Sequence, residues 1–188
     1  MKVYLFRHGE TEWSRASRHT GLTDLELTEE GKREAKCLNQ GLKFDYVLSS
    51  PLKRAKESCI LAGYEKEMVL EPALLEWNYG DYEGLTSSQI WEKDPGWTVF
   101  TKDPPHGETA TEIQKRADGL IRRLKGNKIA LFSSAHFLRS FTARWLKLPV
   151  SEGKHFSLST ASKSILGFEH DQPSIFLWND ISHLSKLG

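Results

Sequence analysis

The stretch Val3–Thr11, with the sequence VYLFRHGET, is where the fold prediction starts. Its first four residues are apolar and rich in β-branched or aromatic side chains, and charge ends the run at Arg7, so it predicts a short buried strand. Such a run is too short for the core of a signal peptide. No other apolar run approaches the roughly 20 residues of a membrane span. We therefore expect a cytoplasmic protein that has no membrane partner.

Outward from this strand, the sequence alternates strand patterns with helix patterns. Further strands are expected at 46–50, 68–70, 128–132, 164–169 and 175–178, helices at 28–40, 51–61, 87–93, 107–125 and 137–146, and a loop at 11–23. The alternation predicts an α/β fold, a three-layer α/β/α sandwich whose mostly parallel sheet is covered on both faces. Ligands of such sheets bind beyond the carboxyl ends of the strands.

Composition limits the class of protein. The chain has 188 residues, of which 38% are hydrophobic and 27% are charged, as is typical of one globular domain. Its formal net charge is +1, and a nucleic-acid binder normally carries a basic excess, so no nucleic-acid partner is expected. Cys37 and Cys59 form neither a disulfide framework nor a metal-ligand pattern and are expected to be buried, reduced thiols.

Three of the strand ends carry residues that suit an anion. Arg7 and His8 follow the first strand, and Arg54 comes shortly after the strand at 46–50. Ser134 and His136 follow the strand at 128–132. Guanidinium groups bind phosphate oxygens in pairs, and cations beside a neutral imidazole lower its pKa and keep it nucleophilic. The residue types alone predict an anion site and no more.

Residues 7–13, RHGETEW, resemble the signature of the histidine phosphatase superfamily, the group that includes the cofactor-dependent phosphoglycerate mutases. The similarity continues at Arg18, Gly21, residues 24–28, Gly31, residues 49–55 (SSPLKRA), residues 74–84 (LLEWNYGDYEG), residues 107–109 and Arg116. It covers about Lys2 to Pro149 and implies a phosphoglycerate mutase-like fold. We expect one domain over residues 1–188, with an aromatic-rich lid insertion at about 77–106. Residues 20–24 and 78–84 look most like the sugar-phosphate phosphatases, including sedoheptulose-bisphosphatase-like members.

The resemblance implies a mechanism. His8 attacks phosphorus and becomes a phosphohistidine, while Arg7 and Arg54 hold the phosphoryl oxygens. Glu76 protonates the leaving alcohol and then deprotonates the attacking water. The further residues expected to contact substrate are Ser14, Thr20, Gly21, Ser134 and Ala135. The implied mechanism requires no metal, we expect no cofactor for this chain, and the implied partner is a small phosphorylated metabolite.

Two positions depart from the family pattern. Ser14 stands where asparagine is most common, and its hydroxyl can still donate to phosphate. The second departure follows from counting onward from the strand at 128–132 and back from Arg139. That count puts Ser134 in the position of the family's second histidine and Ala135 in the position of the following glycine. We expect His136 to compensate as a catalytic residue by turning its ring into the gap.

Two alternatives to a phosphatase remain open at this point. The first is a phosphomutase, although the family's mutases are usually longer than this compact chain. The second is a catalytically impaired protein that binds a phosphorylated ligand, because Ser134 cannot supply a cation. His19 and His106 are expected to border the mouth of the pocket. The sequence predicts no oligomeric state.

Overall fold

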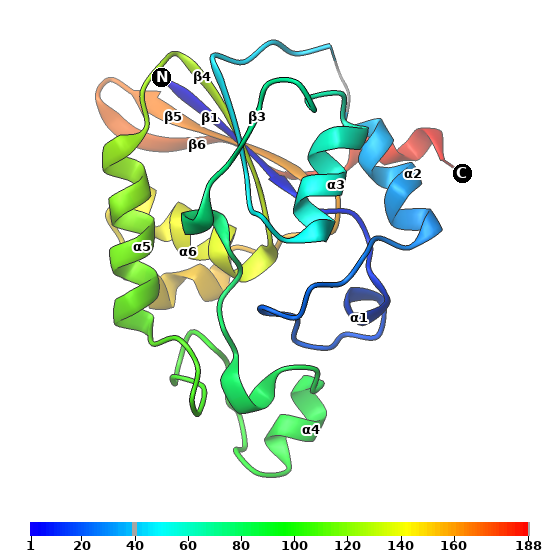
Figure 1. Ribbon diagram of the computed structural model, residues 1–188. Coiled ribbons are helices and arrows are strands. Elements are labelled where there is room, and N and C mark those ends of the chain that lie inside the picture. The colour runs from blue at the N-terminus through cyan, green and yellow to red at the C-terminus, as the bar shows by residue number, and fades with distance from the viewer. Residues whose placement is uncertain (39–40, 188) are drawn as a thin grey trace.

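A six-stranded sheet forms the centre of the protein, whose computed structural model describes residues 1–38 and 41–187 (Figure 1). The strand order is β3-β2-β4-β1-β5-β6. The strands are β1 (Lys2–Arg7), β2 (Tyr46–Ser49), β3 (Met68–Leu70), β4 (Lys128–Ser133), β5 (Lys163–Glu169) and β6 (Gln172–Asp180). Strands β1 to β4 are parallel to one another. At one edge, β5 pairs antiparallel with β1, and β6 pairs antiparallel with β5. The expected mostly parallel sheet is confirmed.

Helices cover both faces of the sheet, as expected. One face carries α2 (Glu29–Cys37) and α3 (Lys53–Leu61), and the other carries α5 (Ala110–Arg123) and α6 (Ala135–Trp145) (Figure 1). Two short helices, α1 (Glu12–Arg15) and α4 (Ser87–Trp91), lie beyond the carboxyl ends of the parallel strands. The connections also contain the 3₁₀ segments η1 (Pro72–Leu74), η2 (Gly80–Tyr82), η3 (Val150–His155) and η4 (Ser182–Lys186).

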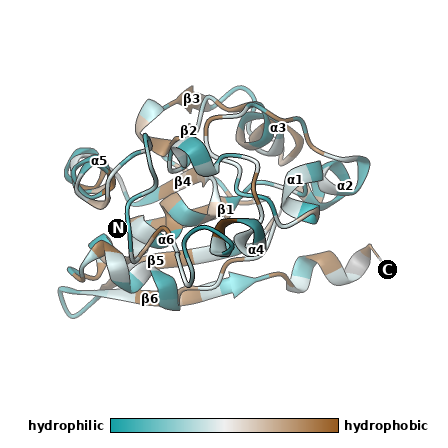
Figure 2. Ribbon diagram, turned by 90° about the horizontal axis from the view of Figure 1, so that it is seen from below, coloured by the Kyte–Doolittle hydropathy of each residue, from teal (hydrophilic) through white to brown (hydrophobic). Residues whose placement is uncertain are grey.

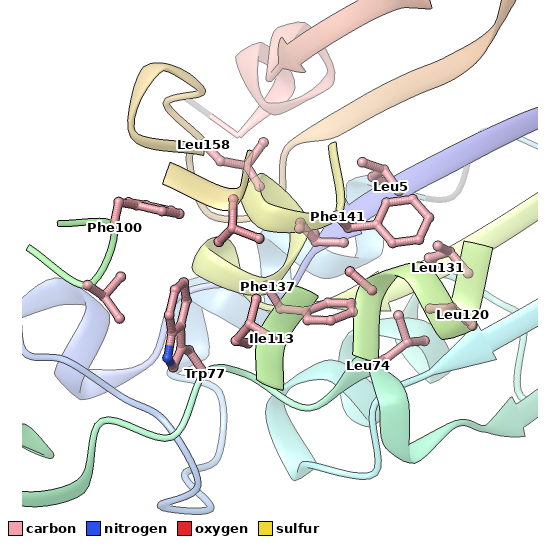
Figure 3. Packing of buried hydrophobic residues seen from close by; sticks show 14 of the residues in the cluster. Leu5, Leu74, Trp77, Phe100, Ile113, Leu120, Leu131, Phe137, Phe141 and Leu158 are labelled. Carbon is pink, nitrogen blue, oxygen red and sulfur yellow. The ribbon is translucent and has the colours of Figure 1, made fainter. Parts of the chain in front are cut away.

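The side-chain alternation along β1 explains the two helical layers. Val3 and Leu5 pack into one apolar cluster with α5 and α6, whereas Tyr4 and Phe6 pack into a second cluster beneath α2 and α3. Successive side chains of a strand point to opposite faces, so a strand without polar interruption must be covered on both sides. Figure 2 shows the hydrophobic residues of the central strands, and Figure 3 shows the first cluster from close by.

Two helices begin where distant residues cap them. The expected start of α3 at Pro51 is wrong, because the helix begins at Lys53, whose backbone N–H donates to the Asp24 carboxylate (2.7 Å). α6 begins at Ala135, two residues before its expected start, and the Glu76 carboxylate accepts hydrogen bonds from its first turn. The first amides of a helix have no partner within the helix and need an outside acceptor. Neither acceptor is close in the sequence.

Other helix boundaries differ from expectation for local reasons. The expected loop at 11–23 contains α1, which Thr11 caps. α5 begins at Ala110 because Thr109 is its cap. Thr28 caps α2 as expected, but α2 ends at Cys37, and the expected end at residue 40 lies outside the described residues.

The aromatic-rich stretch at 77–106 packs into the core. The aromatic residues of this stretch that are buried are Trp77, Tyr79, Tyr82, Trp97 and Phe100, whereas Trp91 is half exposed. The rings of Trp77 and Phe100 meet edge to face, with centroids 5.7 Å apart (Figure 3). Edge-to-face pairs of this kind stabilise the fold by more than the burial of their surface area alone. Movement of the stretch as a lid stays a prediction.

No helix in residues 1–38 and 41–187 is long and apolar enough to span a bilayer. Cys59 is a buried free thiol, and burial raises its pKa to about 12, so it stays protonated. Cys37 is also a free thiol, but it is only half buried, which corrects the expectation that both cysteines are buried.

Candidate active site

A cavity of about 250 Å³ lies at the carboxyl ends of β1 and β4. The expected site residues that line it are Arg7, His8, Ser14, Thr20, Glu76, Ala135 and His136. Those that do not line it are Gly21, Arg54 and Ser134. The remaining lining residues are Ser17, Arg18, His19, Tyr79 and Ser87. The strand ends therefore bring the main expected groups together.

His8 is held as a neutral imidazole with one free ring nitrogen. Its backbone N–H donates to the Ser133 carbonyl (3.0 Å), which ties the end of β1 to the end of β4. Nδ1 lies 2.7 Å from the Gly9 carbonyl oxygen. A carbonyl can only accept, so Nδ1 carries the proton and Nε2 keeps its lone pair. Burial, with the charges of Arg54 and Arg7, lowers the pKa of His8 well below its usual value.

Arg7 combines a fixed position with spare donor capacity. Its Nη1 donates to the Leu158 carbonyl oxygen (2.5 Å). Its Nε is buried and finds no acceptor among the described residues. A buried N–H without a partner costs about 1–3 kcal/mol, and an oxygen of a bound phosphoryl group can remove that cost. Arg7 is therefore suited to hold an anion in the cavity.

Arg54 lies behind the cavity wall, and protein acceptors take most of its donors. It is fully buried, and its Nε donates to the Ser134 hydroxyl (3.3 Å). Its other recorded acceptors are the backbone carbonyls of Thr23 (3.0 Å), Thr20 (3.1 Å) and Gly21 (2.8 Å). These bonds use four of the five guanidinium N–H groups. Its charge still acts on His8, and direct contact with phosphate stays a prediction.

Ser134 and His136 are directed to different partners. The Ser134 hydroxyl accepts from Arg54 outside the cavity lining, whereas His136 is one of the residues that line the cavity. Nδ1 of His136 is hydrogen-bonded to the Tyr79 hydroxyl. The ring lies parallel to that of His19, with centroids 6.1 Å apart. Burial, followed by the nearby Arg139, lowers the pKa of His136 well below its usual value, so the ring is neutral.

Glu76 is a buried carboxyl group at the N-terminus of α6. Its Oε1 accepts from the backbone N–H groups of Trp77 (2.8 Å) and Phe137 (2.7 Å). Its Oε2 accepts a hydrogen bond from the backbone N–H of His136 (3.0 Å). Burial raises the pKa of Glu76 above its usual value, against the opposing effect of these amides and of Arg54. A carboxyl group with a raised pKa can hold a proton and deliver it to a leaving group.

Arg116 on α5 holds the segment that carries Glu76, a role that the sequence did not reveal. Its guanidinium donates to the carbonyls of Ala73 (2.9 Å), Leu75 (2.6 Å) and Glu76 (3.4 Å). Glu108 accepts from its Nε (2.9 Å) and Nη2 (2.7 Å). The guanidinium also lies over the Phe137 ring, 4.6 Å from its centroid. Arg116 thus fastens the Glu76 segment to α6, and all five of its N–H groups are used.

Substituting Arg116→Lys should lower the free energy of unfolding by about 2–3 kcal/mol, because lysine keeps the charge but cannot make five directed hydrogen bonds. Urea denaturation measures the change. Arg123→Lys is the matched control on the same helix, since Arg123 is exposed and pairs with Glu71 at the surface. An equal effect of the two substitutions would contradict the role assigned to Arg116.

Several smaller expectations are refined. The Ser14 hydroxyl lines the cavity but already donates to the Thr11 carbonyl (3.0 Å) in the first turn of α1. Gly21 is needed for packing, because an added Cβ would lie 2.6 Å from the backbone carbonyl oxygen of Trp77. His19 lines the cavity as expected, and His106 is exposed outside it.

Tyr79 and Arg18 are lining residues that the sequence analysis did not select. Tyr79 lies within residues 78–84, and Arg18 also lies in a stretch that carries the family resemblance, but neither pattern indicates a contact. Within the described ranges, no group of three or more His, Cys, Asp or Glu residues is arranged to hold a metal ion.

A buried histidine, an arginine and a buried carboxyl group line one cavity at the carboxyl ends of parallel strands, an arrangement that suits an anionic ligand. The model of the histidine phosphatase superfamily (branch 1) matches residues 3–181. The chain is 40% identical to an acid phosphatase of Mycobacterium tuberculosis over 178 residues, which covers 90% of this chain and 87% of that protein. It is 32% identical to sedoheptulose 1,7-bisphosphatase of Saccharomyces cerevisiae, covering 80% of this chain and 69% of that protein.

Among solved structures, a Mycobacterium tuberculosis protein from an open reading frame superposes with a TM-score of 0.89 at 37% identity, covering 95% of this chain and 96% of that one. The chain therefore belongs to the histidine phosphatase superfamily, and its fold is phosphoglycerate mutase-like. A phosphohistidine mechanism is general to this family.

Proposed function

We propose that the protein hydrolyses small phosphomonoesters without a metal ion, through a phosphohistidine on His8. The observation that carries this proposal is the Nδ1–H bond from His8 to Gly9, which leaves Nε2 unprotonated in a cavity that Arg7 and Glu76 also line. In the first step, Nε2 forms a bond to phosphorus as the bond to the ester oxygen breaks. The carboxyl proton of Glu76 goes to the leaving alkoxide.

The second step regenerates the enzyme. Glu76, now a carboxylate, takes a proton from water, and the resulting hydroxide forms a bond to phosphorus. The P–N bond to His8 breaks, its electron pair returns to Nε2, and phosphate leaves. The positive charges of Arg7 and Arg54 stabilise the negative charge that develops on the phosphoryl oxygens in both steps.

The substrate we propose is a sugar phosphate or a similarly small phosphorylated metabolite of the cytoplasm. One relative named above is a sedoheptulose bisphosphatase and another is an acid phosphatase. A cavity of about 250 Å³ suits a small ester. The test is phosphate release from a panel of sugar phosphates with an excess of metal chelator. Transfer to a second metabolite in place of water would show a phosphomutase instead, and binding without turnover would show a ligand-binding protein.

His136 completes the phosphate site in this proposal, because His136 lines the cavity whereas the Ser134 hydroxyl is bonded to Arg54. We expect His136→Ala to lower kcat/KM by about 30- to 1000-fold, the usual cost of removing one transition-state donor. Ser134→Ala should lower it by less than about tenfold, because it removes a neutral partner behind the wall. Steady-state kinetics measures both. A larger loss in Ser134→Ala than in His136→Ala would show that Ser134, and not His136, donates to the phosphoryl group.

A further inference from the structure

The hydrogen bond between Tyr79 and His136 joins a buried hydroxyl to a partly buried imidazole of a residue that lines the cavity. The Tyr79 side chain is 1% exposed, and its hydroxyl reaches Nδ1 of His136. The two rings meet edge to face, with centroids 5.7 Å apart. His19 lies parallel to the His136 ring on one side, and Phe100 lies at 5.4 Å with Arg139 over its own ring. The imidazole therefore has a defined position.

The direction of this hydrogen bond follows from the two groups. Burial raises the pKa of the Tyr79 hydroxyl well above its usual value, so it keeps its proton. A buried hydroxyl proton needs an acceptor, and among the described residues Nδ1 of His136 is the acceptor recorded for it. Tyr79 therefore donates, Nδ1 accepts, and the proton of the neutral His136 ring is on Nε2.

This arrangement is the opposite of the one at His8. The Gly9 carbonyl, which can only accept, puts the His8 proton on Nδ1 and leaves Nε2 as a nucleophile. The Tyr79 hydroxyl puts the His136 proton on Nε2 and makes that atom a donor. One cavity thus contains a neutral imidazole prepared to attack phosphorus and another prepared to donate to an oxygen.

We propose that Tyr79 is a positioning residue that holds His136 in the Nε2–H tautomer, so that His136 donates a hydrogen bond to a phosphoryl oxygen of the substrate. The inference rests on the proposed function, because it assigns this donor to the same phosphoryl-transfer site. It also gives a reason why the chain works without an imidazole at position 134. The neutral donor that replaces it comes from the next-but-one residue and needs a partner to set its tautomer.

Tyr79→Phe tests the inference, with Tyr82→Phe as the matched control. Tyr82 is also mostly buried in the same stretch, and its hydroxyl bonds Asp94 (3.3 Å) away from the cavity. Nitrogen NMR of the histidine rings should show His136 as the Nε2–H tautomer in the wild type and in Tyr82→Phe. In Tyr79→Phe, the spectrum should shift toward the Nδ1–H form.

Kinetics tests whether the tautomer is used. Tyr79→Phe should lower kcat/KM by about 3- to 10-fold, the loss expected for one hydrogen bond, and Tyr82→Phe by less than about twofold. The loss should disappear when His136→Ala is already present, because Tyr79 acts through His136.

Three results would overturn the inference: an Nδ1–H signal for wild-type His136, an unchanged signal in Tyr79→Phe, or an equal loss with and without His136. They are distinct from failure of the proposed function, which would show as a folded wild type that releases no phosphate from any ester. If the folded wild type releases no phosphate, Tyr79 and His136 have no catalytic role either, whatever tautomer the spectra show.

Discussion

His8→Ala should abolish hydrolysis, lowering kcat by at least about 10³-fold and toward the 10⁶-fold that removal of an enzyme nucleophile can cost. Alanine cannot form the covalent intermediate, and His8 is the histidine of the cavity whose pKa both Arg54 and Arg7 are recorded as lowering. His8 is buried at the end of β1, so removing its ring also opens space for water. Phosphate release under single-turnover conditions measures the loss.

The control for this experiment is His106→Ala, because His106 is exposed and lies outside the cavity. It should leave kcat unchanged. Circular dichroism should show both variants folded, since the strand register of β1 with β4 depends on backbone bonds that the substitution keeps. Full activity in folded His8→Ala would remove the phosphohistidine assignment.

Glu76→Gln should have the second-largest effect, and its size should depend on the leaving group. For alkyl phosphates, whose alkoxide needs a proton, kcat/KM should fall by about 10²- to 10⁴-fold. For p-nitrophenyl phosphate, whose leaving group departs without a proton, the fall should be much smaller. Glu92→Gln, at an exposed glutamate, is the matched control and should change neither. An equal loss for both kinds of ester would contradict proton donation by Glu76.

The pH profile of kcat/KM gives Glu76 a second signature. Activity requires His8 without its proton, so the rate rises with pH through the lowered pKa of His8. It also requires Glu76 with its proton, so the rate falls as pH rises through the raised pKa of Glu76. In Glu76→Gln the alkaline fall should vanish and the acidic rise should remain. Persistence of the alkaline fall would assign it to another group.

The sheet was predictable from the sequence because strand patterns are local. Five of the strands were expected within one residue of their observed bounds, β6 is longer than expected, and the alternation of strand patterns with helix patterns predicted cover on both faces. The starts of α3 and α6 were not predictable in the same way. Their acceptors, Asp24 and Glu76, are distant in sequence and become neighbours only in the folded chain.

The sequence predicted which residues gather at the site better than it predicted the hydrogen bonds that those residues make. The family motifs and the strand ends identified His8, Arg7 and Glu76, and all three line one cavity. Counting assigned Ser134 to the position of the family's second histidine, and this stays a prediction, but counting could not say which of Ser134 and His136 lines the cavity. That depends on Arg54 and Tyr79, whose bonds to these residues span 80 and 57 positions of the chain.

The most direct measurement of the central claim is the covalent state of His8 in Glu76→Gln during turnover of p-nitrophenyl phosphate. The first step with this ester needs no acid, and the second step needs the missing base, so the intermediate should accumulate. Mass spectrometry of the quenched enzyme should find an acid-labile phosphoryl group on His8. Turnover of this ester by Glu76→Gln with His8 free of phosphoryl, or with the group on another residue, would contradict the account.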